Sequence, residues 1–126
     1  MGKRKAARCL HDEAIALTKA TIRIADELGI SQKTLASIIG LSEPTISRMR
    51  KGTFQIERGS GKAFELAQLL LQLFDLLGRL VSGDVTAAKA WLSADNTALG
   101  GRPIDLILSS LGLVRVVEYL RASSSR

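Results

Sequence analysis

The sequence has little of what most enzyme sites are built from. It contains one cysteine, Cys9, and one histidine, His11. A lone cysteine excludes an intramolecular disulfide and is typical of a cytoplasmic protein. One histidine gives no credible metal set and no motif for Ser-His-Asp catalysis. Residues 59–62 (GSGK) resemble the end of a P-loop, but the first glycine and a preceding strand are missing. We therefore expect no enzyme, no cofactor and no metal.

Prolines and aromatic residues are also scarce. The 126 residues include two prolines, Pro44 and Pro103, and 4% aromatic residues, whereas 46% are hydrophobic. Such a chain can bury a core of small aliphatic side chains, which suits packed helices. We predict an all-α fold: a helix-turn-helix bundle over residues 1–60, then a second, small helical domain over residues 61–126.

No stretch reads as a signal peptide or a membrane span. The most apolar stretch, residues 63–81, is interrupted by polar residues spaced three and four apart, namely Glu65, Gln68, Gln72, Asp75 and Arg79. This spacing places them in one stripe of an amphipathic helix with a wide apolar face. We expect that face to supply a homodimer interface, the core, or both, in a protein without membrane contact.

Positive charge is concentrated in the first half of the chain. The net charge is +6, and residues 1–60 carry 11 Lys and Arg against 6 Asp and Glu, whereas residues 61–126 carry 7 against 6. A basic half fits a nucleic-acid partner, because neutralised phosphates release counterions. The alternative is a merely solvated surface. Residues 1–10 are predicted to form a loose basic arm.

Capping and turn residues divide the rest of the chain into helices. We predict them at about residues 12–28, 32–39, 43–51, 63–82, 85–92, 103–109 and 111–122. Ser31, Ser42 and Asp84 are the expected N-caps, and Gly40 and Gly52 are the expected C-terminal glycines. In the first helix the expected shared face is Ile15, Ala16, Ile22, Ala25 and Leu28.

Residues 32–51 have the pattern of a helix-turn-helix. Two steeply crossing helices need a small residue at their contact and a turn residue that tolerates positive φ, and Ala36 and Gly40 occupy these positions. Apolar residues are required at the inward positions, which are Leu35, Ile39, Leu41, Ile46 and Met49. The alternative is an ordinary helical hairpin.

The second helix of this motif presents its outer face to the major groove. Arg48 is the best candidate for reading guanine, and Glu43 can accept from cytosine. Gln32 and Lys33 begin the preceding helix, where a phosphate can bind. The other candidate DNA contacts are Ser42, Pro44, Thr45, Ser47, Arg50 and Lys51. Such proteins usually dimerise on palindromic half-sites. For each charged residue the alternative is a solvated position.

Residues 84–122 resemble the toxin-binding domain of the Xre/MbcA/ParS antitoxins. The matching elements are residues 90–92 (AWL), Asn96, 98–103 (ALGGRP), 106–107 (LI), Gly112, Val114, Val117 and 119–120 (YL). With the preceding helix-turn-helix the resemblance covers roughly residues 20–122. It implies a dimeric antitoxin that covers a RES-domain toxin, which consumes NAD or ADP-ribosylates a target, and that represses its own operon.

The resemblance also implies toxin contacts in residues 96–103 and the last helix. The implied residues are Asn96, Leu99, Gly100, Gly101, Arg102, Pro103, Tyr119 and Arg126. The residues themselves indicate a sharp turn at residues 100–101 that displays Arg102. The alternative is a structural loop, with Trp91 in the core and Arg102 solvated or paired at a helix end. We further expect the frayed cationic tail to enter or cover the toxin's NAD pocket.

Two other functions fit the same sequence. One is a stand-alone dimeric repressor without a toxin, in which residues 84–122 only dimerise. The other is an antitoxin whose helix-turn-helix no longer binds DNA.

Overall fold

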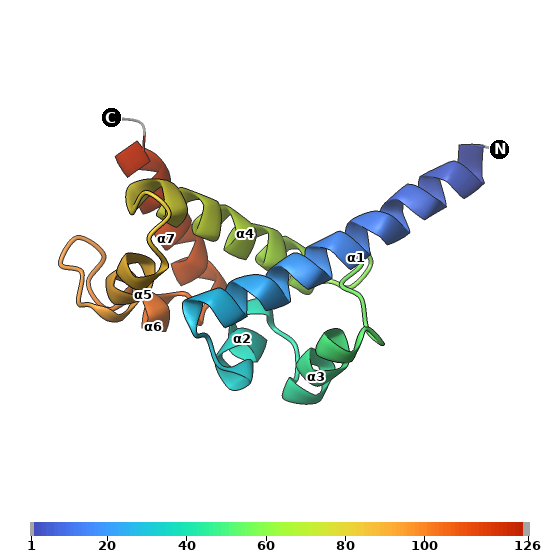
Figure 1. The fold of residues 1–126 in the computed structure, drawn as a ribbon, viewed down its shortest axis with the longest axis horizontal. Helices are drawn as coiled ribbons and strands as arrows, with labels where there is room; N and C mark the ends of the chain where they lie inside the picture. Colours follow the sequence, from blue (N-terminus) through green and yellow to red (C-terminus); the bar gives the residue numbers. More distant parts are fainter. Residues whose placement is uncertain (1, 125–126) are drawn as a thin grey trace.

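The computed structural model describes the backbone of residues 2–124 and the side chains of residues 8–124. Within this part the protein is all-helical, which confirms the predicted fold class (Figure 1). Its helices are α1 (Gly2–Leu28), α2 (Gln32–Ile39), α3 (Glu43–Lys51), α4 (Lys62–Leu80), α5 (Val85–Ser93), α6 (Pro103–Leu106) and α7 (Ser110–Ser124).

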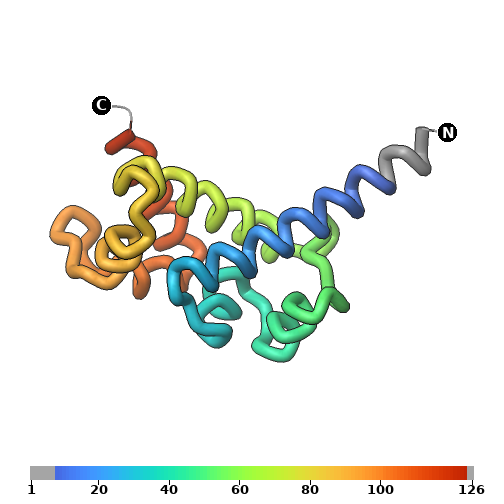
Figure 2. The backbone as a smooth tube through the Cα atoms, viewed as in Figure 1, coloured from blue at the N-terminus to red at the C-terminus, as the bar shows by residue number. Residues whose placement is uncertain are grey.

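Helix α4 runs through the middle of the molecule and contacts helices from both halves of the chain. It packs on α1 and α2 on one side and on α7 on the other. Helices α5 and α6 lie at the end opposite the N-terminal end of α1, and α3 lies beside α2 (Figures 1 and 2). None of the helices in the described part combines the length and the apolarity that crossing a membrane requires.

The prediction of a loose basic arm is wrong for residues 2–10. Helix α1 begins at Gly2, ten residues before the predicted start at Asp12. The physical reason lies in the residue types: residues 3–8 are Lys, Arg and Ala, all strong helix formers, and no proline interrupts them. Once α1 is anchored on the body of the protein, extending it by such residues costs little free energy.

The predicted core face of α1 is only partly right. Ala25 and Leu28 are buried, but Ala16 is exposed and Ile15 and Ile22 are half-buried. The buried face instead contains Ala14, Leu17 and Ile24 together with Thr18 and Thr21.

The two threonines explain the shifted face of α1. The Thr18 hydroxyl donates to the Ala14 carbonyl over 2.7 Å, and the Thr21 hydroxyl donates to the Leu17 carbonyl over 2.7 Å. A threonine whose hydroxyl is bonded to its own helix exposes no unsatisfied polar group and can be buried. Thr18 Oγ1 also accepts from the backbone N–H of Ile56 over 2.8 Å, which fastens the connector before α4 to α1.

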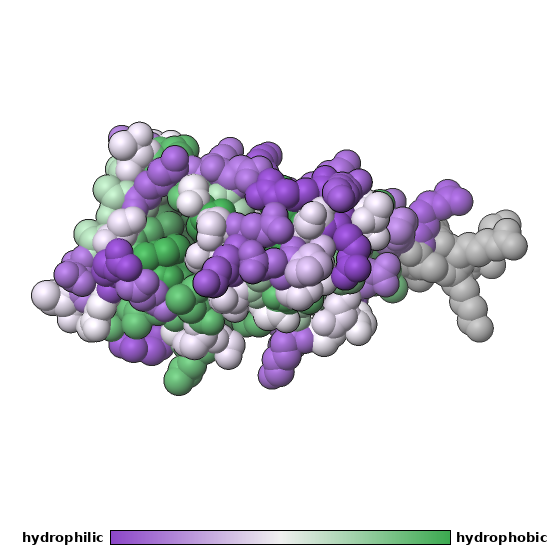
Figure 3. All heavy atoms as spheres, turned by 90° about the horizontal axis from the view of Figure 1, so that it is seen from below, coloured by the Kyte–Doolittle hydropathy of each residue, from purple (hydrophilic) through white to green (hydrophobic). Residues whose placement is uncertain are grey.

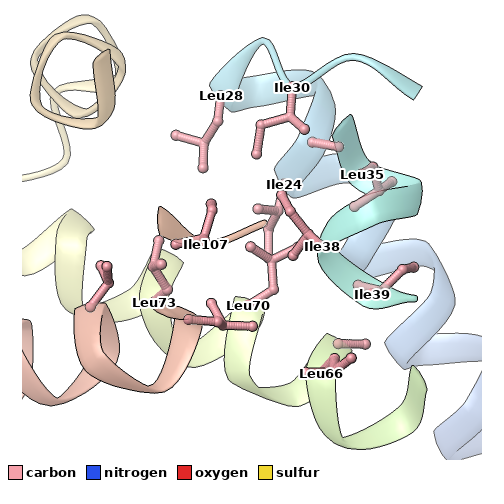
Figure 4. Packing of buried hydrophobic residues seen from close by; sticks show 14 of the residues in the cluster. Ile24, Leu28, Ile30, Leu35, Ile38, Ile39, Leu66, Leu70, Leu73 and Ile107 are labelled. Atoms are coloured by element: carbon pink, nitrogen blue, oxygen red, sulfur yellow. The ribbon is translucent and has the colours of Figure 1, made fainter. Parts of the chain in front are cut away.

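The apolar face of α4 is mostly used by the core of this chain. Leu70, Leu73 and Leu77 are fully buried. Side chains from α1, α2 and the end of α6 point into the space around Leu70 and Leu73 (Figure 4). The predicted polar stripe of α4 is confirmed, because all of its residues are exposed. Burying each leucine contributes about 1.5–3 kcal/mol, so α4 makes a large contribution to the stability of the core.

The turn between α6 and α7 depends on the absence of a side chain at Gly112. A Cβ at this position would overlap the Leu106 carbonyl oxygen and would lie 2.7 Å from its carbonyl carbon. Backbone atoms cannot move aside as a flexible side chain can. Gly112 therefore permits α6 to lie directly against the first turn of α7.

Replacing Gly112 by alanine is expected to lower the free energy of unfolding by about 2–4 kcal/mol, because the backbone of α6 must move. The matched control is Gly78→Ala, in α4, where an added Cβ meets no atom within 4 Å. That change should raise stability by about 0.5–1 kcal/mol through helix propensity. Urea denaturation measures both; equal effects of the two substitutions would contradict the close approach of α6 and α7.

Candidate nucleic-acid interface and toxin-binding loop

The caps of α2 and α3 have the geometry that the sequence predicts. Ser31 Oγ accepts from the backbone N–H of Thr34 over 3.1 Å, and Ser42 Oγ accepts from that of Thr45 over 3.3 Å. Gly40 and Gly52 adopt left-handed φ values of 72° and 80°, which end the two helices. The inward positions Leu35, Ala36, Ile39, Ile46 and Met49 are buried, whereas Leu41 is half-buried and packs against the same core. The helix-turn-helix pattern is therefore confirmed in space.

Helix α3 presents a polar outer face. Glu43, Pro44, Arg48 and Lys51 are exposed and Ser47 is half-buried. Their spacings of three and four residues place them on the side opposite the buried Ile46 and Met49. This is the face that a recognition helix turns toward the major groove.

Two of the predicted DNA contacts support this face from beneath. Ser42 Oγ and Thr45 Oγ1 share a hydrogen bond of 2.8 Å, and the Thr45 side chain is buried. Thr45 Oγ1 also accepts from Arg48 Nη2 over 3.1 Å. Thr45 thus restrains the Arg48 guanidinium on the outer face instead of projecting from the protein itself.

The predicted phosphate contacts at the start of α2 differ in their surroundings. Gln32 Nε2 donates to the backbone carbonyl of Glu43 over 3.1 Å, which joins the N-termini of α2 and α3. Lys33 is exposed beside it. Gln32 therefore holds the two helices of the motif together, and Lys33 supplies positive charge at their shared edge.

Arg50 links α3 to α1. Its two terminal nitrogens donate to the Asp26 carboxylate over 2.8 and 3.2 Å. The hydrogen bonds to Arg50 lower the pKa of Asp26, although partial burial opposes this effect and the Arg50 charge adds to it. Hydrogen bonding to Asp26 likewise raises the pKa of Arg50. Asp26 is the residue that sequence reasoning missed, since its partner lies 24 positions away and leaves no local signal.

Residues 96–101 form a tight loop held by its own backbone. The N–H of Asn96 donates to the Gly101 carbonyl over 3.0 Å, and the Asn96 carbonyl accepts from the N–H groups of Gly100 and Gly101 over 2.8 and 3.2 Å. Asn96 Oδ1 accepts from the Leu99 N–H over 3.1 Å. The left-handed φ of 81° at Gly100 confirms the predicted sharp turn.

Two of the loop's predicted toxin contacts face the protein interior. The side chains of Leu99 and Pro103 are buried. The Leu99 carbonyl accepts from Arg115 Nη2 over 3.2 Å, which ties the loop to α7. Asn96, Leu99 and Pro103 thus shape the loop.

Arg102 is displayed, but it is paired at a helix end. Its guanidinium donates to both carboxylate oxygens of Asp105 over 2.8 and 3.1 Å. These hydrogen bonds, together with the Asp105 charge, raise the pKa of Arg102. The sequence left two structural alternatives for Arg102, a solvated position and a pair at a helix end, and the structure shows the pair. Nearly half of the Arg102 side chain stays accessible, at 48%.

Tyr119 lies in a shallow apolar groove away from the loop's hydrogen bonds. Its ring stacks on Trp91 with a centroid separation of 6.3 Å and an interplanar angle of 25°. Trp91 is half-buried, so it is neither fully in the core nor fully displayed. The groove, of about 610 Å³, is lined by Leu80, Val81, Ala87, Ala90, Trp91, Ala94, Tyr119 and Ser123.

The end of α7 differs slightly from the prediction. The helix continues to Ser124, so Ser123 and Ser124 are helical and not frayed. Their hydroxyls donate to the carbonyls of Tyr119 and Arg121 over 3.0 and 2.9 Å. Arg126, the last predicted toxin contact, lies outside the described residues.

Across residues 8–124, no group of three or more His, Cys, Asp and Glu side chains is arranged to hold a metal ion.

Arg48→Ala is expected to weaken binding to the DNA upstream of the protein's own gene by about 1–3 kcal/mol, roughly 5- to 150-fold, because a bidentate base contact is lost. The control is Arg79→Ala, which removes another exposed positive charge, on α4. Fluorescence anisotropy at one fixed salt concentration measures both affinities. Wild-type affinity in Arg48→Ala would show that this residue does not contact the bases.

Asp26→Asn is expected to lower the free energy of unfolding at neutral pH by no more than about 1 kcal/mol, because the pair is solvent-exposed. A lowered carboxyl pKa gives stability that is present above pH about 4 and is lost as the pH falls through the pKa of folded Asp26. The difference between wild type and variant should therefore disappear in acid. Urea denaturation across this range measures it, with Asp12→Asn on the same helix as control; a difference independent of pH would contradict the ion pair.

Two family models match the chain. Residues 11–72 match the antitoxin Xre-like helix-turn-helix domain, and residues 72–124 match the antitoxin Xre/MbcA/ParS C-terminal toxin-binding domain. The two models meet at Gln72, inside α4. A search of the curated proteins finds no match to the chain. The protein is therefore an Xre/MbcA/ParS antitoxin, with an N-terminal Xre-like helix-turn-helix DNA-binding domain and a C-terminal toxin-binding domain.

Proposed function

We propose that this antitoxin neutralises a RES-domain toxin by covering its active site and represses its own operon through the helix-turn-helix. The observation that carries the proposal is the joining of a toxin-binding domain to a recognition helix with an intact outer face. Because Thr45 holds Arg48 on that face, the geometry favours a chain that still binds DNA. This supports the two-function protein over the antitoxin that has lost DNA binding.

The identity of the toxin follows from the resemblance in residues 96–103, which is to antitoxins paired with RES-domain toxins. Such toxins consume NAD or transfer its ADP-ribose to a target. We propose that the exposed part of the loop, around Gly100 and Arg102, meets the toxin. The C-terminal residues through Arg126 bring positive charge toward phosphates in the NAD pocket. In this scheme the antitoxin acts by binding alone, without a cofactor and without catalysis.

The operator is proposed to be a palindrome bound by a homodimer, since helix-turn-helix proteins usually read two half-sites. The face of α4 that suggested an interface is largely buried within the chain. Next to it, an apolar groove of about 540 Å³ lies between α1 and α4.

We propose that the boundary between the DNA-binding and toxin-binding functions lies near residue 60, where the connector leads into α4. We also propose that the protein acts in the cytoplasm, where its DNA and toxin are.

The proposal is tested by expressing the protein with the product of its adjacent gene. We expect the adjacent gene to arrest growth alone, and the antitoxin to restore growth and to co-purify with its product. An antitoxin shortened to end at Arg121 should give weaker protection in the same growth assay, because the cationic tail is removed. If no complex and no toxicity are found, the toxin partnership is wrong and the chain is a stand-alone dimeric repressor.

A further inference from the structure

The turn before α7 and the first half of α7 carry exposed hydrophobic side chains. Leu108, in the turn, is 42% exposed, and Leu111 and Val114, in the helix, are 73% and 40% exposed. Leu111 and Val114 are three residues apart, so they lie on one face of α7. We call these three residues the apolar stripe. Figure 3 shows hydrophobic side chains gathered at the end of the molecule that holds α5, α6 and α7.

The clustering of these residues is unusual. In the part of the chain whose side chains are described, the large exposed hydrophobic residues are Leu10, Leu80, Val85, Leu108, Leu111 and Val114. Half of them fall within residues 108–114. Scattered exposed leucines need no explanation, whereas exposed hydrophobic residues concentrated in one short segment are typical of a contact site.

Charged residues precede and follow the apolar stripe in the sequence. Further along the same face of α7, Glu118 and Arg121 are exposed and bonded to each other over 2.7 Å. Before the stripe lies the exposed pair of Arg102 and Asp105. An apolar centre with a charged border is the usual arrangement of a protein–protein interface.

The backbone under the stripe is rigid. Ser109 Oγ accepts from the Gly112 N–H over 3.0 Å, and the Ser109 carbonyl accepts from the Leu113 N–H over 2.9 Å. The close approach of Gly112 to Leu106 fixes the direction in which α7 leaves the turn. A surface that is already ordered loses little conformational entropy on binding, which favours affinity.

We infer that the apolar stripe is the principal contact for the toxin, with Leu111 inserted into an apolar pocket on the toxin surface. This inference rests on the proposed function. The toxin is the occupant because the stripe lies inside residues 72–124, the part that matches a toxin-binding domain. Arg102, in the loop that is proposed to meet the toxin, precedes the stripe by six residues in the sequence.

Leu111→Asp tests this inference in the full-length protein with the purified product of the adjacent gene. We expect at least about tenfold weaker binding by isothermal titration calorimetry, because a carboxylate would be desolvated in an apolar pocket. Leu10→Asp is the matched control, because it makes the same substitution at another exposed leucine, which is 48% accessible. Leu10 lies on α1, outside the toxin-binding domain. It should bind like the wild type. Leu108→Asp is the second stripe variant, used if Leu111→Asp does not fold by circular dichroism.

Each outcome decides between named alternatives. Toxin affinity within twofold of wild type in a folded stripe variant overturns the inference and leaves the proposed function intact. A change in oligomeric state on light scattering, with or without a change in toxin affinity, assigns the stripe to a second copy of this chain and also overturns it. Failure of the wild-type protein to bind the adjacent product is a different result, because it refutes the proposed function and the inference with it.

Discussion

The packing of α4 is the constraint on which the rest of the structure depends. Leu70, Leu73 and Leu77 have no accessible surface, and their neighbours come from α1 and α2 on one side and α7 on the other. One cluster of buried hydrophobic residues runs from Leu17 to Leu120. Figure 4 shows the part of it around Leu70 and Leu73. The helix-turn-helix and the toxin-binding domain therefore share one hydrophobic core. The two family models likewise meet at Gln72, inside α4.

This shared core fixes the position of each functional surface. Gly40, at the turn of the DNA-binding motif, lies against α4: a Cβ there would be 3.7 Å from a methyl group of Leu66. On the other side, Arg121 of α7 donates to Gln72 of α4 over 2.8 Å. The DNA-binding motif and the toxin-binding helix α7 are thus both packed on α4. The recognition helix is held further by the Arg50–Asp26 pair, and the loop of residues 96–103 by Arg115.

Local features of this protein could be predicted from its sequence, and distant ones could not. The caps at Ser31, Ser42 and Asp84 act within three residues, so the sequence is enough to place the ends of their helices. The face of α1 was misplaced because Thr18 and Thr21 are polar by type but buried in fact. The predicted start of α1 was wrong because the positive charge of residues 3–8 was given more weight than their strong helix propensity.

The functional residues follow the same division between local and distant effects. Arg48 and Lys51 lie on the predicted outer face, because helical spacing determines it. The pairing of Arg50 with Asp26 depends on how α1 and α3 cross, which spacing does not reveal. Leu99 belongs to a recognisable motif, yet its side chain points inward. Conversely, nothing local in the sequence marks Leu111 as exposed, and its 73% exposure appears only in the folded structure.

The most direct test of the shared core compares two probes of unfolding in urea. Trp91, the only tryptophan, reports by fluorescence on the toxin-binding half, and circular dichroism reports on all helices, of which α1 to α3 form the DNA-binding half. A single core predicts transitions that coincide, with one midpoint for both signals. A fluorescence transition that is complete while a large part of the helical signal persists would contradict the account, because the two halves would then fold independently.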